Sequence, residues 1–174
     1  MTASDLRGVD TYRGDRIHVE SWHQGYDFAD KRVAVIGTDS RTVRIVPELA
    51  GIAAFVKVFQ CAPRWIFPYA VPGQFTEGPV RQWVVARLAR AHLRTQVEDP
   101  WLRRQLTPDH PPEATRVLVA GDYYRALQQP NCKLIDWPIA TFSPVGVRTS
   151  DGVEHHVDAI VFGDARGRDG QYLR

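Results

Sequence analysis

The segment from residue 31 to 44, KRVAVIGTDSRTVR, constrains the fold of this chain more than any other. Residues 32–36 form a short, continuous apolar run rich in β-branched residues, which is typical of a parallel strand covered on both faces. Gly37 ends this run, and Ser40 is predicted to be the N-cap of the helix that follows. The segment therefore predicts a strand, a sharp turn and the start of a helix.

A second strand is predicted at residues 55–59, so two strands and the helix between them form a β-α-β unit. We therefore expect an α/β fold with a Rossmann-like unit. After this unit, the sequence predicts an irregular connection at 61–78 and helical structure from about 80 to 106. It then predicts a strand at 116–120, a short helix at 122–127 and a strand at 133–136. A hairpin is predicted over 145–160, and it leads into a strand at 159–162.

The turn matches only part of the glycine fingerprint of dinucleotide-binding units. In G-x-G-x-x-G, the first glycine permits the tight turn, the second lets the backbone approach a pyrophosphate, and the third lets helix and strand pack closely. Here these positions hold Gly37, Asp39 and Thr42. Taken alone, the turn is compatible with nucleotide binding and equally with a purely structural β-α-β unit.

Motifs on both sides of the turn resemble one enzyme family. Residues 12–22, YRGDRIHVESW, resemble the F-x-G-x-x-x-H-x-x-x-W signature of Baeyer–Villiger monooxygenases, with Tyr12 in place of the phenylalanine. Gly14, His18 and Trp22 occupy the other signature positions. The resemblance continues in the same order along nearly the whole chain. It implies that the histidine and the tryptophan belong to the segment that links the FAD and NADP domains in that family, and without an FAD domain a packing role is favoured for both.

The resemblance implies an NADP-binding-like domain in a family that also uses FAD. It assigns residues 1–30 to an N-terminal linker that carries the signature, and residues 31–174 to the NADP-binding-like domain with a partial helical insertion at 79–107. Family members are several times longer and open with an FAD-binding unit, whereas residues 2–10 here show no strand–turn–helix pattern. Because the flavin activates oxygen, no autonomous oxygenase activity is expected.

The resemblance also assigns the site residues. The cofactor-binding candidates are Gly37, Thr38, Ser40, Gln60 and Arg64, and the catalytic candidate is Arg116. The family's 2′-phosphate arginine is replaced by Cys61, and its phosphate lysine is replaced by Thr115. Each missing charged hydrogen bond is worth roughly 1.5–3 kcal/mol, so NADP binding is expected to be weakened.

Asp39 replaces the second glycine and brings a negative charge to the place where a cofactor pyrophosphate would lie. A like-charge pair about 4 Å apart costs roughly 4 kcal/mol at an effective dielectric constant near 20. The same carboxylate suits the positive end of a helix when no ligand is bound. We therefore expect Asp39 to fill the anion site and to weaken NADP binding further.

Composition argues against several other classes of protein. The chain has 174 residues and a formal net charge of +2, and its aromatic residues do not interleave with basic ones, so no nucleic-acid binding is expected. The sequence has neither an apolar run of membrane-spanning length nor a signal-peptide pattern, so we expect a cytoplasmic protein without a membrane partner. His155 and His156 lack the ligand spacing of a metal site, and none is expected.

Three functions remain open on these patterns. The favoured one is a truncated relative of an FAD- and NADPH-dependent Baeyer–Villiger monooxygenase, without autonomous oxygenase activity. The first alternative is the NADPH-binding half of a split flavin monooxygenase, with a separate FAD-domain chain as its partner. The second alternative is a non-catalytic nucleotide-binding module. Apolar surface that an absent domain would otherwise cover also predicts self-association.

Overall fold

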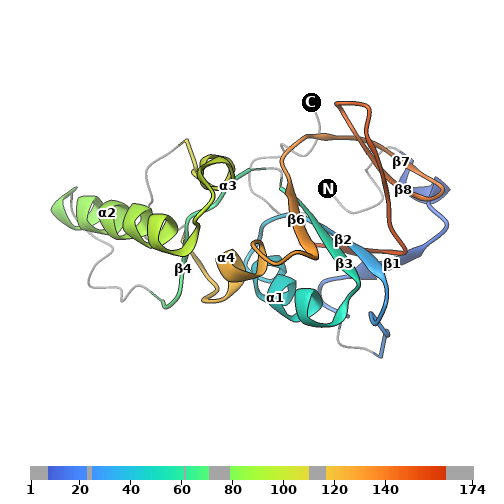
Figure 1. Cartoon of the computed structure of the whole chain (residues 1–174), viewed down its shortest axis with the longest axis horizontal. Coiled ribbons are helices and arrows are strands. Elements are labelled where there is room, and N and C mark those ends of the chain that lie inside the picture. The colour runs from blue at the N-terminus through green and yellow to red at the C-terminus, as the bar shows by residue number, and fades with distance from the viewer. Residues whose placement is uncertain (1–7, 23–24, 61, 71–78, 110–116, 164–174) are drawn as a thin grey trace.

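The largest sheet of the described residues is parallel and has five strands in the spatial order β1-β10-β2-β3-β6, of which β1, β2, β3 and β6 are labelled on the right of Figure 1. The computed structural model describes residues 8–22, 25–60, 62–70, 79–109 and 117–163. The predicted α/β class and the predicted β-α-β unit are confirmed. The five strands are β1 (Asp15–His18), β2 (Arg32–Ile36), β3 (Phe55–Phe59), β6 (Cys132–Ile135) and β10 (Ala159–Phe162).

The parallel sheet is covered on both faces, and side-chain alternation along β2 shows how. Val33 and Val35 belong to the apolar cluster that contains the buried face of helix α1 (Thr42–Ile52). Ala34 and Ile36 point the other way, into a second cluster shared with an antiparallel sheet. Because both faces are buried, β2 is apolar after its first residue, as expected for a central parallel strand.

The antiparallel sheet consists of β7 (Ile139–Ser143), β8 (Gly146–Thr149) and β9 (Glu154–His156), in that order. It lies on the side of the parallel sheet opposite α1 (Figure 1). Gly152 in the β8–β9 turn has φ 86°, a left-handed conformation that glycine adopts without strain, and the predicted hairpin is confirmed. Strand β7 was not predicted from the sequence, because it is defined only by its pairing with β8.

The single helical stretch predicted from about 80 to 106 is in fact two helices, α2 (Pro79–Gln96) and α3 (Pro100–Gln105). Asp99 separates them, because its backbone is extended and its carboxylate accepts a hydrogen bond from Trp101 N at 2.9 Å. An aspartate cap followed by proline is a strong signal for a new helix start.

The remaining elements are short. A two-stranded parallel sheet forms from β4 (Ile66–Phe67) and β5 (Leu118–Val119), so the connection predicted to be irregular at 61–78 contains a strand in its described part. That strand depends on a partner far along the chain, which a local pattern does not show. Helix α4 (Tyr123–Ala126) lies within the predicted range, and the turn η2 (Val9–Thr11) precedes β1.

The signature segment is built into the parallel sheet. Strand β1 pairs in parallel with β10, and the register places His18 opposite Phe162. The Tyr12 hydroxyl donates to the carbonyl oxygen of Val157 at 3.0 Å, and Gly14 lies so close that a Cβ there would overlap the Tyr12 phenol ring. Part of the segment assigned to an N-terminal linker therefore forms an edge strand.

Candidate functional site

The carboxyl ends of the parallel strands meet at one edge of the sheet, where ligands bind in open α/β folds. The turn after β2 lies between the ends of β3 and β10, because these strands flank β2 on either side. Gly37 has φ 108°, and its N–H donates to the Phe59 carbonyl at 3.0 Å. This conformation strains any residue with a side chain, so the first fingerprint glycine keeps its usual structural role.

Asp39 caps the helix that begins after the turn. Its Oδ1 accepts hydrogen bonds from Arg41 N at 2.8 Å and from Thr42 N at 3.0 Å. In return, Thr42 Oγ1 accepts a hydrogen bond from Asp39 N at 2.8 Å, so the side chain of each residue accepts from the backbone amide of the other. The prediction of Ser40 as N-cap is wrong, because α1 begins at Thr42 with Arg41 at the N-cap position, and the amides of these two residues donate to the Asp39 carboxylate, whose charge suits the positive helix end.

Gly163 closes the site from the end of β10. An added Cβ there would overlap Asp39 Oδ2 and would lie 2.7 Å from Thr42 Cγ2 and 2.9 Å from the Ile36 carbonyl oxygen. The missing side chain therefore lets the strand end approach the capped turn. As a result, the Asp39 carboxylate occupies the space between the helix N-terminus and β10.

Two further predicted cofactor residues are buried and bonded within the protein. Thr38 Oγ1 donates to the Ala62 carbonyl at 2.9 Å, and Gln60 Nε2 donates to the Gln105 carbonyl at 2.9 Å. The first bond joins the turn to the segment after β3, and the second joins the end of β3 to α3. Arg64 follows two residues after Ala62 and is half-buried. The structure therefore places Thr38 and Gln60 at the carboxyl edge of the sheet, at the ends of β2 and β3.

Other predicted residues are more dispersed. Arg116, the catalytic candidate, lies outside the described residues, and so do Cys61 and Thr115. His18 is exposed at the end of β1, with its ring centre 6.3 Å from that of Phe162. Trp22 is buried in the core beneath α1, where its indole forms part of the wall of a pocket.

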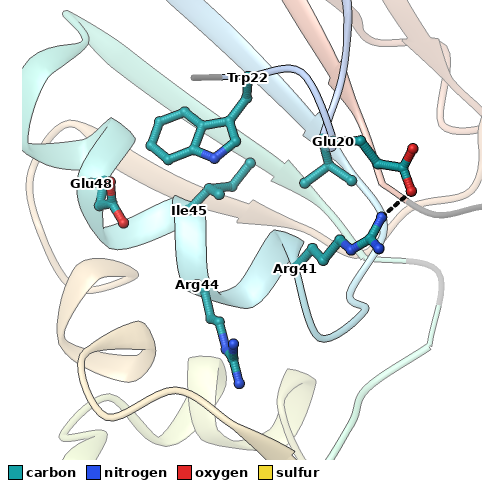
Figure 2. Close-up of a pocket in the computed structure, with 7 residues that line it drawn as sticks. Glu20, Trp22, Arg41, Arg44, Ile45 and Glu48 are labelled. Carbon is teal, nitrogen blue, oxygen red and sulfur yellow. Dashed lines mark hydrogen bonds and ion pairs between the residues drawn. The ribbon is translucent and has the colours of Figure 1, made fainter. Parts of the chain in front are cut away.

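That pocket has a volume of about 390 Å³ and lies between the segment after β1 and the first turns of α1 (Figure 2). Arg41 forms an ion pair with Glu20 across its mouth, whereas Arg44 Nε donates to the Val119 carbonyl at 3.4 Å. The sequence patterns did not single out these charges, although positions 41, 44 and 48 share one helical face. The lining residues are Val19, Glu20, Trp22, Arg41, Arg44, Ile45 and Glu48.

The buried titratable groups elsewhere are structural. Burial raises the pKa of the Cys132 thiol to about 12, which makes it a poor nucleophile. Burial, with a smaller contribution from Lys57, lowers the pKa of His155, whose Nε2 lies 3.1 Å from Thr149 Oγ1. Throughout the described ranges, no cluster of metal-ligating side chains is found, and no helix is long and apolar enough to cross a bilayer.

The chain resembles known proteins in sequence and in fold, although no family model matches it. A Baeyer–Villiger monooxygenase of Pseudomonas aeruginosa is 32% identical in an alignment that is 190 positions long with its gaps and covers 91% of this chain and 36% of that protein. An open cyclohexanone monooxygenase structure matches with a TM-score of 0.81 at 23% identity, over 91% of this chain and 44% of that one. An NADP-bound steroid monooxygenase gives 0.78 at 24% identity, with 91% and 43% covered. The chain thus spans rather more than a third of the curated relative's length.

Proposed function

Because the chain is a relative of the Baeyer–Villiger monooxygenases, we propose that it forms a nicotinamide-dinucleotide-binding domain whose affinity for NADP is weakened. The family relationship supports the cofactor class, since one structural neighbour is an NADP complex. The observation that carries the proposed weakening is the Asp39 cap on α1. The turn after β2 keeps the first fingerprint glycine, Gly37, and the Asp39 side chain accepts hydrogen bonds from the amides that follow it.

The turn as it stands does not fit a bound pyrophosphate. A pyrophosphate at a helix N-terminus accepts hydrogen bonds from backbone amides, and those of Arg41 and Thr42 already donate to Asp39. A ligand must break these bonds and then tolerate the displaced carboxylate nearby. Loss of a helix cap costs about 1 kcal/mol, and repulsion from the displaced carboxylate adds to this cost, so the displacement lowers affinity by about tenfold or more.

Replacing the carboxylate tests this proposal. Asp39→Gly should raise the affinity for NADPH at least tenfold in an isothermal titration, because it frees both amides and removes the charge. Asp30→Gly is the matched control, since Asp30 is exposed, has φ 58° and loses the same charge away from the turn. Equal NADPH affinity in the natural chain and the folded Asp39→Gly variant would contradict the proposal.

We also infer that the isolated chain does not oxygenate substrates by itself. In this family the flavin supplies the oxygen-activating chemistry, and the described residues contain no turn with the complete G-x-G-x-x-G fingerprint that an FAD-binding unit would carry. The purified chain should therefore not consume NADPH when FAD, oxygen and a cyclic ketone are supplied. Ketone-dependent NADPH oxidation under these conditions would refute the inference.

The outer face of helix α2 favours a second candidate, the NADPH-binding half of a split flavin monooxygenase. Trp83 is 60% exposed and Leu88 is 55% exposed on this face, and the Arg87 guanidinium lies 5.1 Å from the Trp83 ring centre. Tryptophan and arginine are the residues that most often dominate protein–protein interfaces. Coexpression with an FAD-binding chain should then leave flavin on the tagged natural chain and none on a Trp83→Ala variant.

A further inference from the structure

We propose that Arg41 is a phosphate-binding residue of the turn, and that Glu20 holds its guanidinium until a phosphate-bearing ligand takes it over. This inference rests on the proposed dinucleotide function and deepens it. It names a cation of this chain that can bind phosphate, although Cys61 and Thr115 stand where the family has its phosphate-binding arginine and lysine.

Arg41 lies at the N-terminus of α1, where a phosphate would bind. Its own N–H is one of the two amides that donate to Asp39, and it immediately precedes the first residue of α1. The side chain therefore starts at the point where phosphate oxygens would approach the helix end. It is half exposed, so the guanidinium can change partner without repacking the core.

The ion pair between Arg41 and Glu20 is exposed and can be exchanged for another contact. Both side chains are well exposed, at 50% for Arg41 and 70% for Glu20, and exposed ion pairs contribute only about 0–1 kcal/mol. A phosphate group can bind a guanidinium through two oxygens, as a carboxylate can, and its larger negative charge attracts the guanidinium more strongly. Exchange of the carboxylate for a phosphate is therefore favourable, whereas loss of Glu20 alone changes the fold little.

The pocket beside Arg41 indicates the kind of ligand. Val19, Trp22 and Ile45 supply apolar walls, which suit an organic group attached to the phosphate. In Figure 2, Arg41 points toward Glu20 while Arg44 points away from it, and Arg44 already donates to a backbone carbonyl. Arg41 is thus the arginine of this pocket that can exchange its partner for a phosphate ester or pyrophosphate.

The test uses the full chain in an Asp39→Gly background, where the amides are accessible. Inorganic pyrophosphate and NADPH are titrated separately at one ionic strength into variants with Glu20→Gln or Arg41→Gln. We expect Glu20→Gln to tighten pyrophosphate binding about threefold and Arg41→Gln to weaken it about tenfold. The controls are Asp10→Asn and Arg16→Gln, which change the same charges in the exposed Arg16–Asp10 pair and should have no effect.

The outcomes separate this inference from the function it rests on. Binding of pyrophosphate that depends on Arg41, without any binding of NADPH, would support the phosphate residue and contradict the dinucleotide proposal. Binding of NADPH that is equal in the Arg41→Gln and Arg16→Gln variants would overturn the inference and leave the dinucleotide proposal intact. Failure of a folded Asp39→Gly, Glu20→Gln double variant to bind pyrophosphate would also overturn it.

Discussion

Two aspartates accept hydrogen bonds from backbone amides at opposite edges of the parallel sheet, one between two strands and the other at the N-terminus of helix α1. At the amino edge, Asp158 accepts hydrogen bonds from Arg32 N at 2.8 Å and from the same residue's guanidinium at 2.7 and 3.0 Å. At the carboxyl edge, Asp39 accepts from Arg41 N and Thr42 N. The Asp158 carboxylate joins β2 to the start of β10, whereas the Asp39 carboxylate is proposed to oppose cofactor binding, so substitutions at the two edges should separate stability from affinity.

The largest expected effect lies at the amino edge, at Gly14. A Cβ there would overlap the Tyr12 phenol and would lie 2.6 Å from the Asp158 carbonyl oxygen, which belongs to the backbone and cannot move aside easily. We expect Gly14→Ala to lower the free energy of unfolding by about 1–3 kcal/mol, measured by urea denaturation. Gly51→Ala is the matched control, because Gly51 lies in α1 with no atom near the added Cβ. Equal urea midpoints for the two variants would show that the amino edge is not tightly packed.

The next prediction compares the two carboxylates directly. Asp158→Ala should lower the free energy of unfolding by about 1–2 kcal/mol, since it leaves the Arg32 guanidinium and amide without their acceptor, and it should not change NADPH affinity. Asp39→Ala should lower the free energy by about 1 kcal/mol through loss of the helix cap, and it should increase NADPH affinity. Denaturation and titration of both variants provide the check. If Asp158→Ala and Asp39→Ala changed the free energy of unfolding and the NADPH affinity in the same way, the two carboxylates would not differ in role.

Local patterns predict the parts of the fold that local interactions determine. The strand at 32–36, the helix after it and the strand at 55–59 follow from periodicity, and the hairpin follows from its Asp-Gly turn. Strands β1 and β4 are not predictable in this way, because each is defined by pairing with a strand more than 50 residues away along the chain. The break at Asp99 is different, because an aspartate followed by Pro100 is a recognisable cap signal that periodicity alone overlooks.

The candidate site also contains features that the sequence predicts and features that it does not. The sequence shows that Asp39 replaces a fingerprint glycine, so a carboxylate near the helix N-terminus could be predicted. The reciprocal hydrogen bonds between Asp39 and Thr42 could not. The Glu20–Arg41 pair joins two segments whose proximity only the folded sheet determines. For Gly163, the sequence shows the residue, but its contact with the turn depends on β10 lying beside β2.

The smallest expected effect is a pH dependence of the amino edge. Hydrogen bonds from the Arg32 side chain lower the pKa of Asp158 from 3.8 to about 2, so its stabilisation is complete above pH 4 and is lost as the pH falls toward 2. Asp158→Asn keeps an acceptor oxygen and removes the charge, and the side chain is 34% exposed, so we expect a difference from the natural chain of only about 1 kcal/mol at pH 5. In urea denaturation this difference should shrink between pH 4 and pH 2. A difference that stays constant over this range would mean that hydrogen bonding alone, without the charge, accounts for the contribution of Asp158.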